Sequence, residues 1–284
     1  MRKRALACLS TGIVAGLLGT AEAKIVNLAD ATIDGVAGGD TGTINGGTFT
    51  FNNVGVSGTG TYIAFVRVQA NGMEEGYNTS ERGVAYDENT SPSFTHDLTL
   101  GEVAVVDLAG VPNLEFSLDV NEVASNGNEY ISLDRLEVWV GPNSFVGSGG
   151  APLISEFAGL GLTQIYDMDG APDGDSAVYL DYNKGSSGSG QPDMFFHLPV
   201  SSLPAGVTGD TFVYLYSKFG ESGDKPVVGD LDGDTVAHLD TGDGFEEWAQ
   251  RQGVSTFVVP VPAAAWMGLP VLAGIAIAKR RMVA

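Results

Sequence analysis

Two short stretches of this 284-residue chain are rich in aspartate and could bind a hard cation such as Ca²⁺. Their acids alternate with glycine and other small residues, and Ca²⁺ takes roughly six to eight oxygen ligands from carboxylates and backbone carbonyls. The candidate metal ligands are Asp230, Asp232, Asp234, Asp240 and Asp243 in the later stretch and Asp167, Asp169, Asp173 and Asp175 in the earlier one.

The later stretch begins like an EF-hand loop but does not match one. Thr235 stands where that loop needs its turn glycine, and Thr241 stands where it needs a bidentate glutamate. A nonstandard Ca²⁺ loop and a solvated acidic turn therefore both remain open, because Asp and Gly are also the residues that turns prefer. The same two alternatives apply to the earlier stretch. Ca²⁺ is the only cofactor that the sequence suggests, and a protein without a cofactor is the alternative.

Residues arranged for catalysis are sparse. The three histidines occur singly, and the chain has no HExxH motif, no P-loop and no Gly-x-Ser-x-Gly elbow. His197 lies in an alternating apolar run, which favours a structural or surface role. A glycosidase needs two opposed carboxyl groups, and none of the 35 acids is singled out as such a pair. We therefore expect a protein that is not an enzyme.

Glu246 and Glu247 are neighbours in sequence and would diverge on a strand. The nearby Phe245 and Trp248 are expected to anchor this segment to the core, in preference to stacking on a sugar. A short turn near residues 244–250 is the one helical signal between the two ends of the chain.

Short runs of alternating hydrophobicity, punctuated by the chain's 40 glycines, predict an all-β protein. Leu114, Phe116, Leu118 and Val120 share one face, which predicts a half-buried strand with polar residues on its other face. A phase change at Asp134-Arg135 predicts a β-bulge. Other strands are expected at residues 48–51, 62–68, 131–140, 177–182, 194–198 and 211–216, the last one central and covered on both faces. The fold class is therefore an antiparallel β-sandwich, jelly-roll-like, over residues 24–258.

The N-terminus, residues 1–23, has the features of a signal peptide. Three basic residues precede an apolar segment, and Ala21-Glu22-Ala23 fits the small-x-small cleavage rule, so signal peptidase is expected to cut after Ala23. An uncleaved N-terminal helix is the alternative. Cys8 is the only cysteine, and its removal would leave a chain without disulfides or thiolate metal sites.

The C-terminus contains an uncharged apolar segment followed by bases. Residues 261–278 are long enough to span a bilayer as a helix. Lys279, Arg280 and Arg281 follow at once and place the C-terminus in the cytoplasm by the positive-inside rule. A plain C-terminal anchor in the inner membrane is one interpretation of this segment.

The order of elements in residues 259–284 resembles the PEP-CTERM class of bacterial sorting signals, in its VPLPA-type variant. The resemblance rests on Val259, Pro260, Val261 and Pro262, the Gly-containing apolar segment, and Lys279, Arg280 and Arg281. Val261 replaces the Glu of the commoner form. The resemblance implies that an exosortase-like membrane protease cuts the tail and releases the protein or transfers it to the cell surface.

The body, over about residues 76–248, is similar to a region that recurs in other exosortase-sorted proteins and has no assigned activity. The similarity is carried by residues 76–79, 86–89, 91–92, 131–134, 166–169, 214–220 and 243–248. It adds to the expected localisation and says little about chemistry.

The chain is strongly acidic, with a net charge of −21. Removing residues 1–23 and 279–284 takes away six of its 14 bases and one of its 35 acids and leaves −26. Such a body repels nucleic acid and anionic lipid headgroups and attracts cations. We therefore exclude nucleic acid as a partner.

Three functions follow, in decreasing order of support. The first is a secreted, exosortase-processed protein of the bacterial cell surface or extracellular matrix, with a structural or adhesive role. The second is a Ca²⁺-stabilised carbohydrate-binding module with an extracellular polysaccharide as its partner. The third is a polysaccharide-active hydrolase. All three place the body outside the cytoplasm, first on a membrane-anchored precursor.

Overall fold

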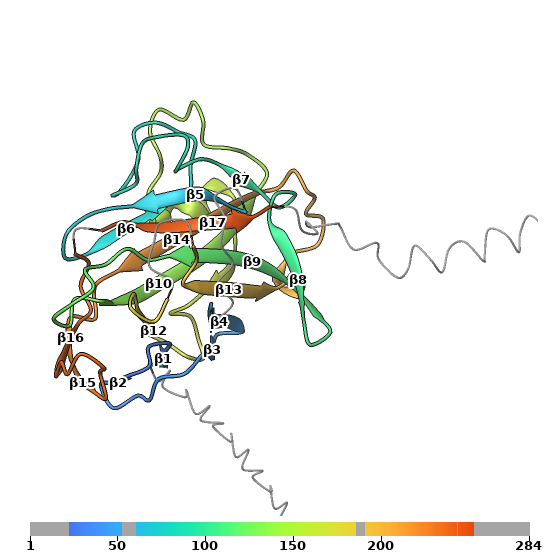
Figure 1. Cartoon of the computed structure of the whole chain (residues 1–284). Helices are drawn as coiled ribbons and strands as arrows, with labels where there is room; N and C mark the ends of the chain where they lie inside the picture. The colour runs from blue at the N-terminus through green and yellow to red at the C-terminus, as the bar shows by residue number, and fades with distance from the viewer. Residues whose placement is uncertain (1–22, 53–60, 186–190, 243, 253–284) are drawn as a thin grey trace, which may run out of the picture.

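A computed structural model describes residues 23–52, 61–185, 191–242 and 244–252 of the chain. These residues form two seven-stranded sheets and one three-stranded sheet (Figure 1). The expectation of an all-β protein built mainly from antiparallel pairs is confirmed. Residues 1–22 and 253–284 lie outside the described residues, so the expected signal peptide helix and membrane-spanning helix do too. None of the helices within the described ranges has the length and hydrophobicity to cross a membrane.

The first sheet contains the longest strand of the structure and one parallel pair. Its strands are β1 (Ile25–Asn27), β6 (Glu74–Tyr77), β7 (Leu98–Thr99), β10 (Tyr130–Gly141), β11 (Thr163–Asp167), β12 (Ala177–Asp181) and β14 (Phe212–Phe219). Their order is β1-β12-β10-β14-β6, with β11 beside β10 and β7 beside β14. The pair β1–β12 is parallel, and the other pairs are antiparallel.

The second sheet is antiparallel throughout its described pairs. Its strands are β3 (Thr41–Ile44), β4 (Gly47–Phe51), β5 (Tyr62–Val68), β8 (Ala104–Leu108), β9 (Val111–Asp119), β13 (Met194–Pro199) and β17 (Glu246–Arg251), in the order β3-β4-β13-β9-β17-β5 with β8 beside β9. The small sheet joins β2 (Thr32–Ile33), β15 (Asp224–Val228) and β16 (Val236–His238). Two short 3₁₀ helices, η1 (Ile154–Leu160) and η2 (Val200–Ser202), complete the described elements.

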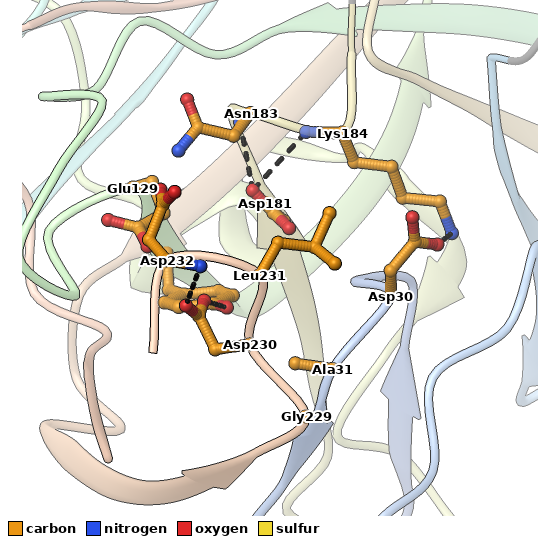
Figure 2. A pocket seen from close by; sticks show the side chains of 11 residues that line it. Asp30, Ala31, Glu129, Asp181, Asn183, Lys184, Gly229, Asp230, Leu231 and Asp232 are labelled. Carbon is orange, nitrogen blue, oxygen red and sulfur yellow. Dashed lines mark hydrogen bonds and ion pairs between the residues drawn. The ribbon is translucent and has the colours of Figure 1, made fainter. Parts of the chain in front are cut away.

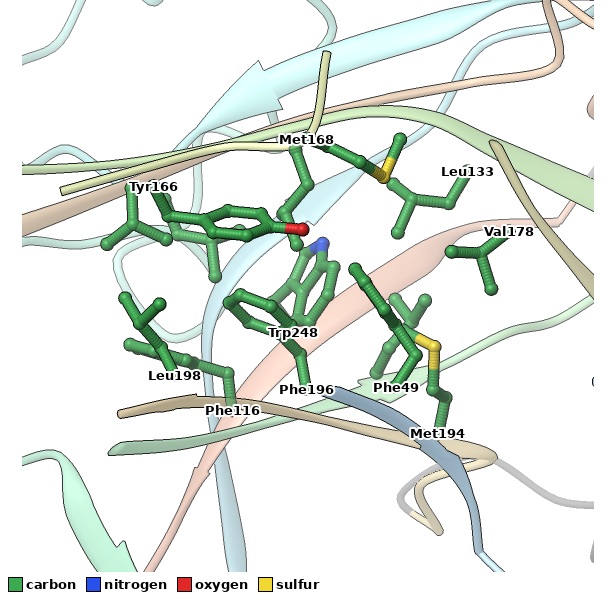
Figure 3. Packing of buried hydrophobic residues seen from close by; sticks show 14 of the residues in the cluster. Phe49, Phe116, Leu133, Tyr166, Met168, Val178, Met194, Phe196, Leu198 and Trp248 are labelled. Carbon is green, nitrogen blue, oxygen red and sulfur yellow. The ribbon is translucent and has the colours of Figure 1, made fainter. Parts of the chain in front are cut away.

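The main hydrophobic core lies between the two large sheets. Phe116, Phe196 and Trp248 of the second sheet pack in one cluster with Leu133 and Tyr166 of the first, and Figure 3 shows these side chains interleaved. Each such side chain contributes roughly 1.5–3 kcal/mol when it leaves water. Alternation along each strand thus places one apolar face of each sheet against the other, which is the arrangement of a β-sandwich.

Strand β14 is covered on both faces, as expected. Val213 and Leu215 face the main core, whereas Tyr214 and Tyr216 belong to a second, aromatic cluster with Phe157 of η1. The expected bulge is also confirmed, because the register between β10 and β14 shifts between Leu133 and Arg135.

The prediction of an exposed polar face on β9 is wrong. Glu115, Ser117 and Asp119 are as buried as the apolar residues that alternate with them. Their polar atoms have partners from distant segments: Arg251 forms an ion pair with Glu115 at 2.8 Å, and Ser117 donates to the Ala249 carbonyl at 2.8 Å. A period-two pattern therefore identified the strand, but not what covers its second face.

The expected turn near residues 244–250 is also wrong, because this segment forms strand β17. Trp248 pairs with Val66 of β5 on one side and with Leu118 of β9 on the other. Pairing with two distant strands gives the backbone N–H and C=O groups of this segment their hydrogen-bond partners. Such tertiary contacts override the preference of the local sequence for a turn.

Candidate metal centre

The loop between β15 and β16 contains the first three candidate aspartates and is shaped by Asp230. Its Oδ1 accepts hydrogen bonds from the backbone N–H groups of Asp232 at 2.7 Å and Gly233 at 2.9 Å. An aspartate whose side chain accepts hydrogen bonds from the backbone N–H groups that follow it in sequence forms an Asx turn, which explains the sharp bend of this loop. Tyr130 of β10 donates its hydroxyl to Asp230 Oδ2 and so fastens the loop to the first sheet.

Glu129 adds a further carboxylate to this loop. One oxygen from each of Glu129, Asp230 and Asp234 lies within 4.8 Å of the other two. Glu129 is only 1% exposed, yet neither of its carboxylate oxygens accepts a hydrogen bond from the described residues, and Asp234 Oδ2 is buried without a partner too. Buried polar atoms are nearly always satisfied, so these three residues, here called the loop site, could hold a positively charged ligand.

The electrostatics of the loop site agree with this interpretation. Burial raises the pKa of Glu129, and the charges of Asp230 and Asp234 raise that pKa further. At Asp230, burial also acts against ionisation, but hydrogen bonds from Tyr130 and from backbone N–H groups outweigh it and lower the pKa. A cation between these carboxylates would favour the ionised form of each one.

Lys184 lines a pocket beside the loop site, but its charge neutralises acids that do not belong to the loop site. Its Nζ forms ion pairs with Asp30 at 2.9 Å and Asp40 at 3.0 Å, and it donates to the Leu28 carbonyl at 2.8 Å. Figure 2 shows the lysine reaching to Asp30, across the pocket from Glu129. Among the described residues, no ion pair reaches the loop site.

The pocket beside the loop site has a volume of about 70 Å³, and four aspartates and Glu129 are among the residues that line it. Ca²⁺ holds its ligands at about 2.3–2.6 Å, so two ligands of one ion lie up to about 5 Å apart. The carboxylate oxygens of the loop site lie within 4.8 Å of one another, which fits this range of distances between ligands. Its donors are all carboxylates, which suit Ca²⁺, Mg²⁺ or Mn²⁺ and not a soft metal.

The structure divides the five candidates of the later stretch. Asp230 and Asp234 belong to the loop site, and Asp232 is exposed on the same loop. Asp240 lies apart from them, in a group with Asp224 and His238. His238 Nδ1 is 2.8 Å from Asp224 Oδ1, and these partly or fully exposed groups are explained by a surface ion pair without a metal. Asp243 lies outside the described residues.

Three of the four candidates of the earlier stretch accept hydrogen bonds from backbone N–H groups, two within their own loop and one from the turn between β3 and β4. Asp167 Oδ1 accepts the N–H of Asp169 at 3.1 Å, and Asp169 Oδ1 accepts the N–H of Ser176 at 3.1 Å. Asp173 Oδ2 accepts the N–H of Asn45 at 2.7 Å, while Asp175 is exposed. Within the described ranges, no three carboxylates of this stretch come together as those of the loop site do.

Glu129 was missed by the sequence analysis. A hundred residues separate Tyr130 from the aspartate that its hydroxyl contacts, and no spacing rule connects two such segments. The only local signal is an acid at the end of the turn-rich segment 125–128, directly before a strand.

The other residues considered for chemistry have structural surroundings. His197 is buried with Nε2 at 3.3 Å from Glu115 Oε2, which confirms its structural interpretation. Trp248 is fully buried in the main core, as expected for an anchor. Glu247 accepts a hydrogen bond from Arg67 at 2.7 Å. Glu246 is completely buried.

No family model matches this chain, and no curated protein or solved structure matches it either. The resemblance of residues 259–284 to the PEP-CTERM class, and that of residues 76–248 to a region of exosortase-sorted proteins, therefore stay predictions from the sequence. The function has to be inferred from the residues of this chain.

Proposed function

We propose that this chain is a secreted bacterial protein of the cell surface or extracellular matrix, with a structural or adhesive role and no enzymatic activity. Its body would be a jelly-roll-like β-sandwich that signal peptidase and an exosortase-like protease release from a membrane-anchored precursor. The observation that carries the proposal is the order of elements in the tail: the Val-Pro dipeptides at residues 259–262, the apolar segment, and the bases at 279–281.

The position of the folded body supports this proposal. Lys24, the first residue after the expected signal cleavage, accepts a hydrogen bond from the Ala177 N–H at 3.1 Å and leads into β1 beside β12. At the other end, Gln252 donates to the Thr61 carbonyl at 2.7 Å. Every described strand therefore lies between the two expected cleavage positions, so processing at both would leave the sandwich intact.

Mass spectrometry of the mature protein tests the proposal. The full chain is expressed in a bacterium that has an exosortase-like protease and in a matched strain that lacks it. We expect an N-terminus at Lys24 in both strains, and a C-terminus near residues 260–262 only in the first. A Pro260→Ala/Pro262→Ala variant should keep its tail in the first strain, whereas a Pro270→Ala control should still be cut. An identical, uncut C-terminus in both strains would refute exosortase processing.

A second candidate function, a Ca²⁺-stabilised carbohydrate-binding module, is favoured by the loop site. The unpartnered oxygens of Glu129 are its specific support. Calorimetric titration with CaCl₂ should show binding that weakens by at least about tenfold in Glu129→Gln, since even outer-shell changes at metal sites have effects of that size. Asp232→Asn, which removes an exposed charge from the same loop, should bind nearly as well as the wild type.

Equal loss in both variants would mean that only the general acidity of the loop attracts the ion. A glycan-array screen with and without Ca²⁺ tests the carbohydrate part separately. Binding of no glycan under either condition would leave the structural or adhesive role as the remaining candidate.

A further inference from the structure

A pocket of about 380 Å³ lies where the described chain begins and β1 forms the edge of the first sheet. Ala23 forms part of its wall, beside Ile25 of β1 and Ala177 of β12. Ala23 is also the last residue of the expected signal peptide. Because its carbonyl carbon is bonded to the nitrogen of Lys24, cleavage between them would open this part of the wall and leave a new α-amino group at the rim of the pocket.

The nitrogen of Lys24 is held against the start of β12. The parallel register of β1 and β12, carried back beyond the first paired residues, places Lys24 opposite Ser176 and Ala23 opposite Asp175. The Lys24 N–H donates to Ser176 Oγ at 3.4 Å, and the Lys24 carbonyl accepts the Ala177 N–H at 3.1 Å. The α-nitrogen is therefore already beside Ser176 and Asp175 while Ala23 is still attached.

The pocket is predominantly acidic. Asp134, Asp175 and Glu221 are among the residues that line it, together with one base, Lys225. The Nζ of Lys225 is 3.6 Å from Oδ2 of Asp34, so part of its charge is already matched by another acid. The surplus of negative charge favours a cationic group in this pocket.

Asp175 is the acid of this pocket for which the described residues supply no partner. Both oxygens of the buried Asp134 accept hydrogen bonds from serine hydroxyls, and one also accepts the Glu221 N–H. The Glu221 carboxylate forms an ion pair with Lys218 at 2.8 Å. In contrast, no donor within the described ranges reaches the carboxylate of Asp175, which is exposed. An available carboxylate thus lies opposite the residue that cleavage removes.

We propose that this pocket binds the free α-ammonium group of Lys24 in the processed protein, with Asp175 as its ion-pair partner and Ser176 as a hydrogen-bond acceptor. A peptide nitrogen has one N–H donor, whereas an α-ammonium has three and a positive charge, and charge-assisted hydrogen bonds are the stronger ones. The inference rests on the proposed cleavage after Ala23 and goes further, because it gives that cut a consequence for the fold. Processing would fasten β1, an edge strand of 3 residues, to β12.

This ion pair should make the stability of the processed protein depend on pH. A neighbouring carboxylate favours the charged form of an amine, so the pKa of the α-amino group rises above its unfolded value of about 7.7–8.0. The stabilisation is then complete at pH 7 and is lost as the pH rises through the folded pKa.

Other titratable groups around the α-nitrogen do not change on cleavage. They are the Lys24 side chain, whose Nζ is 3.6 Å from Asp173, and Asp134, Asp169, Tyr179, Glu221 and Lys225. All of them are present with and without Ala23. A comparison of two N-termini therefore isolates the contribution of the ammonium group.

The test compares two purified chains in detergent that differ only at the N-terminus. One begins at Lys24, and the other begins at residue 22 with Glu22→Ala, which keeps the peptide N–H of Lys24 and adds no charge. Both run to residue 284 and are released from a fusion partner by a protease that leaves no extra residue. At pH 7, calorimetry should show a melting temperature about 1–4 °C higher for the chain that begins at Lys24, as expected for one partly exposed ion pair. At pH 10 the two chains should melt alike.

Matched substitutions assign the effect to one carboxylate. Asp175→Asn in both chains should abolish the difference at pH 7. Glu221→Gln, at another exposed acid of the pocket, and Asp210→Asn, at an exposed aspartate outside it, should leave the difference unchanged. The proposal is overturned if the two unsubstituted chains melt alike at pH 7, if the difference persists in Asp175→Asn, or if Glu221→Gln removes it instead.

The outcome is independent of the test of processing, because both N-termini are produced in vitro. Equal melting of the two chains would overturn the role of the pocket and leave cleavage after Ala23 untouched. A mature N-terminus other than Lys24 in the mass spectra would refute that cleavage without changing the calorimetric result.

Discussion

Trp248 donates its indole N–H to the Ser217 hydroxyl over 3.0 Å, and this bond joins β17 of the second sheet to β14 of the first. Both residues are completely buried. The indole lies among the apolar side chains packed between the sheets (Figure 3), and its one polar atom bonds to a residue of the opposite sheet. Because an unpaired buried donor is costly, this bond specifies how the two sheets face each other.

Trp248→Ala should destabilise the fold by about 3–5 kcal/mol, as is usual when a large aromatic side chain leaves a cavity. Ser217→Ala removes only the hydrogen bond and should cost about 1–3 kcal/mol, because the indole N–H stays buried. Urea unfolding followed by circular dichroism measures both. Val146→Ala, at an exposed position, is the control and should change stability by less than about 0.5 kcal/mol. Equal effects of Trp248→Ala and Val146→Ala would contradict the role given to this core.

Asn45 docks the β3–β4 hairpin onto the loop after β11. It lies in the left-handed region with a φ of 47°, and its amide donates to the carbonyls of Met168 at 2.9 Å and Gly170 at 2.6 Å. Asn45→Ala should therefore cost about 1–3 kcal/mol from the unsatisfied carbonyls, in addition to backbone strain.

Asn126→Ala measures that strain alone. Asn126 has a φ of 62° but is exposed, and its side-chain amide donates to the hydroxyl of its neighbour Ser125 at 3.2 Å. We expect Asn45→Ala to be clearly more destabilising than Asn126→Ala in thermal unfolding. Similar losses in the two variants would show that the docking bonds contribute little.

Asp193 should make stability decrease with rising pH. Burial raises the pKa of Asp193 to about 8, whereas an unfolded aspartate titrates near about 3.9. Between these values the folded state keeps a proton that the unfolded state loses. The stabilisation is thus complete below about pH 4 and is lost as the pH rises towards 8, at up to about 1.4 kcal/mol per pH unit.

Asp193→Asn should reduce the fall of the unfolding free energy with pH, measured by urea unfolding between pH 5 and 8, since asparagine resembles the protonated acid. Its side-chain oxygen can still accept the hydrogen bond from the Val120 N–H that Asp193 Oδ2 accepts at 2.8 Å. Asp210→Asn, at an exposed position, serves as the control and should leave the slope as it is. An unchanged slope in Asp193→Asn would assign the pH dependence to other acids.

Tyr130 should support cation binding at the loop site without touching the ion. Its hydroxyl fixes the orientation of Asp230, and the loss of such an outer contact commonly weakens metal binding by about 10–100-fold. Calorimetric titration of Tyr130→Phe with CaCl₂ should show a loss in this range. Tyr182→Phe should bind normally. Unchanged affinity in Tyr130→Phe would mean that the Asx turn alone positions Asp230.

The local pattern of hydrophobic residues was sufficient to predict a strand wherever the residues of that strand themselves determine its structure. The alternation around Phe116, the phase change at Asp134-Arg135 and the aromatic face of β14 all led to elements that the structure contains. Pattern failed where a distant segment decides the outcome. Segment 246–251 carries no strong strand signal, yet it forms β17 because β5 and β9 pair with it on both sides.

The candidate site shows the same division. The sequence by itself determined the all-β fold, the acidic charge and the turn chemistry of Asp230, because these depend on composition and on neighbours within a few residues. Only the tertiary structure decided that Glu129 meets Asp230 and Asp234 and that Asp240 does not. The physical reason is that a ligand group is defined by distances between side chains, and in a sheet protein those distances are set by pairing between strands far apart in the chain.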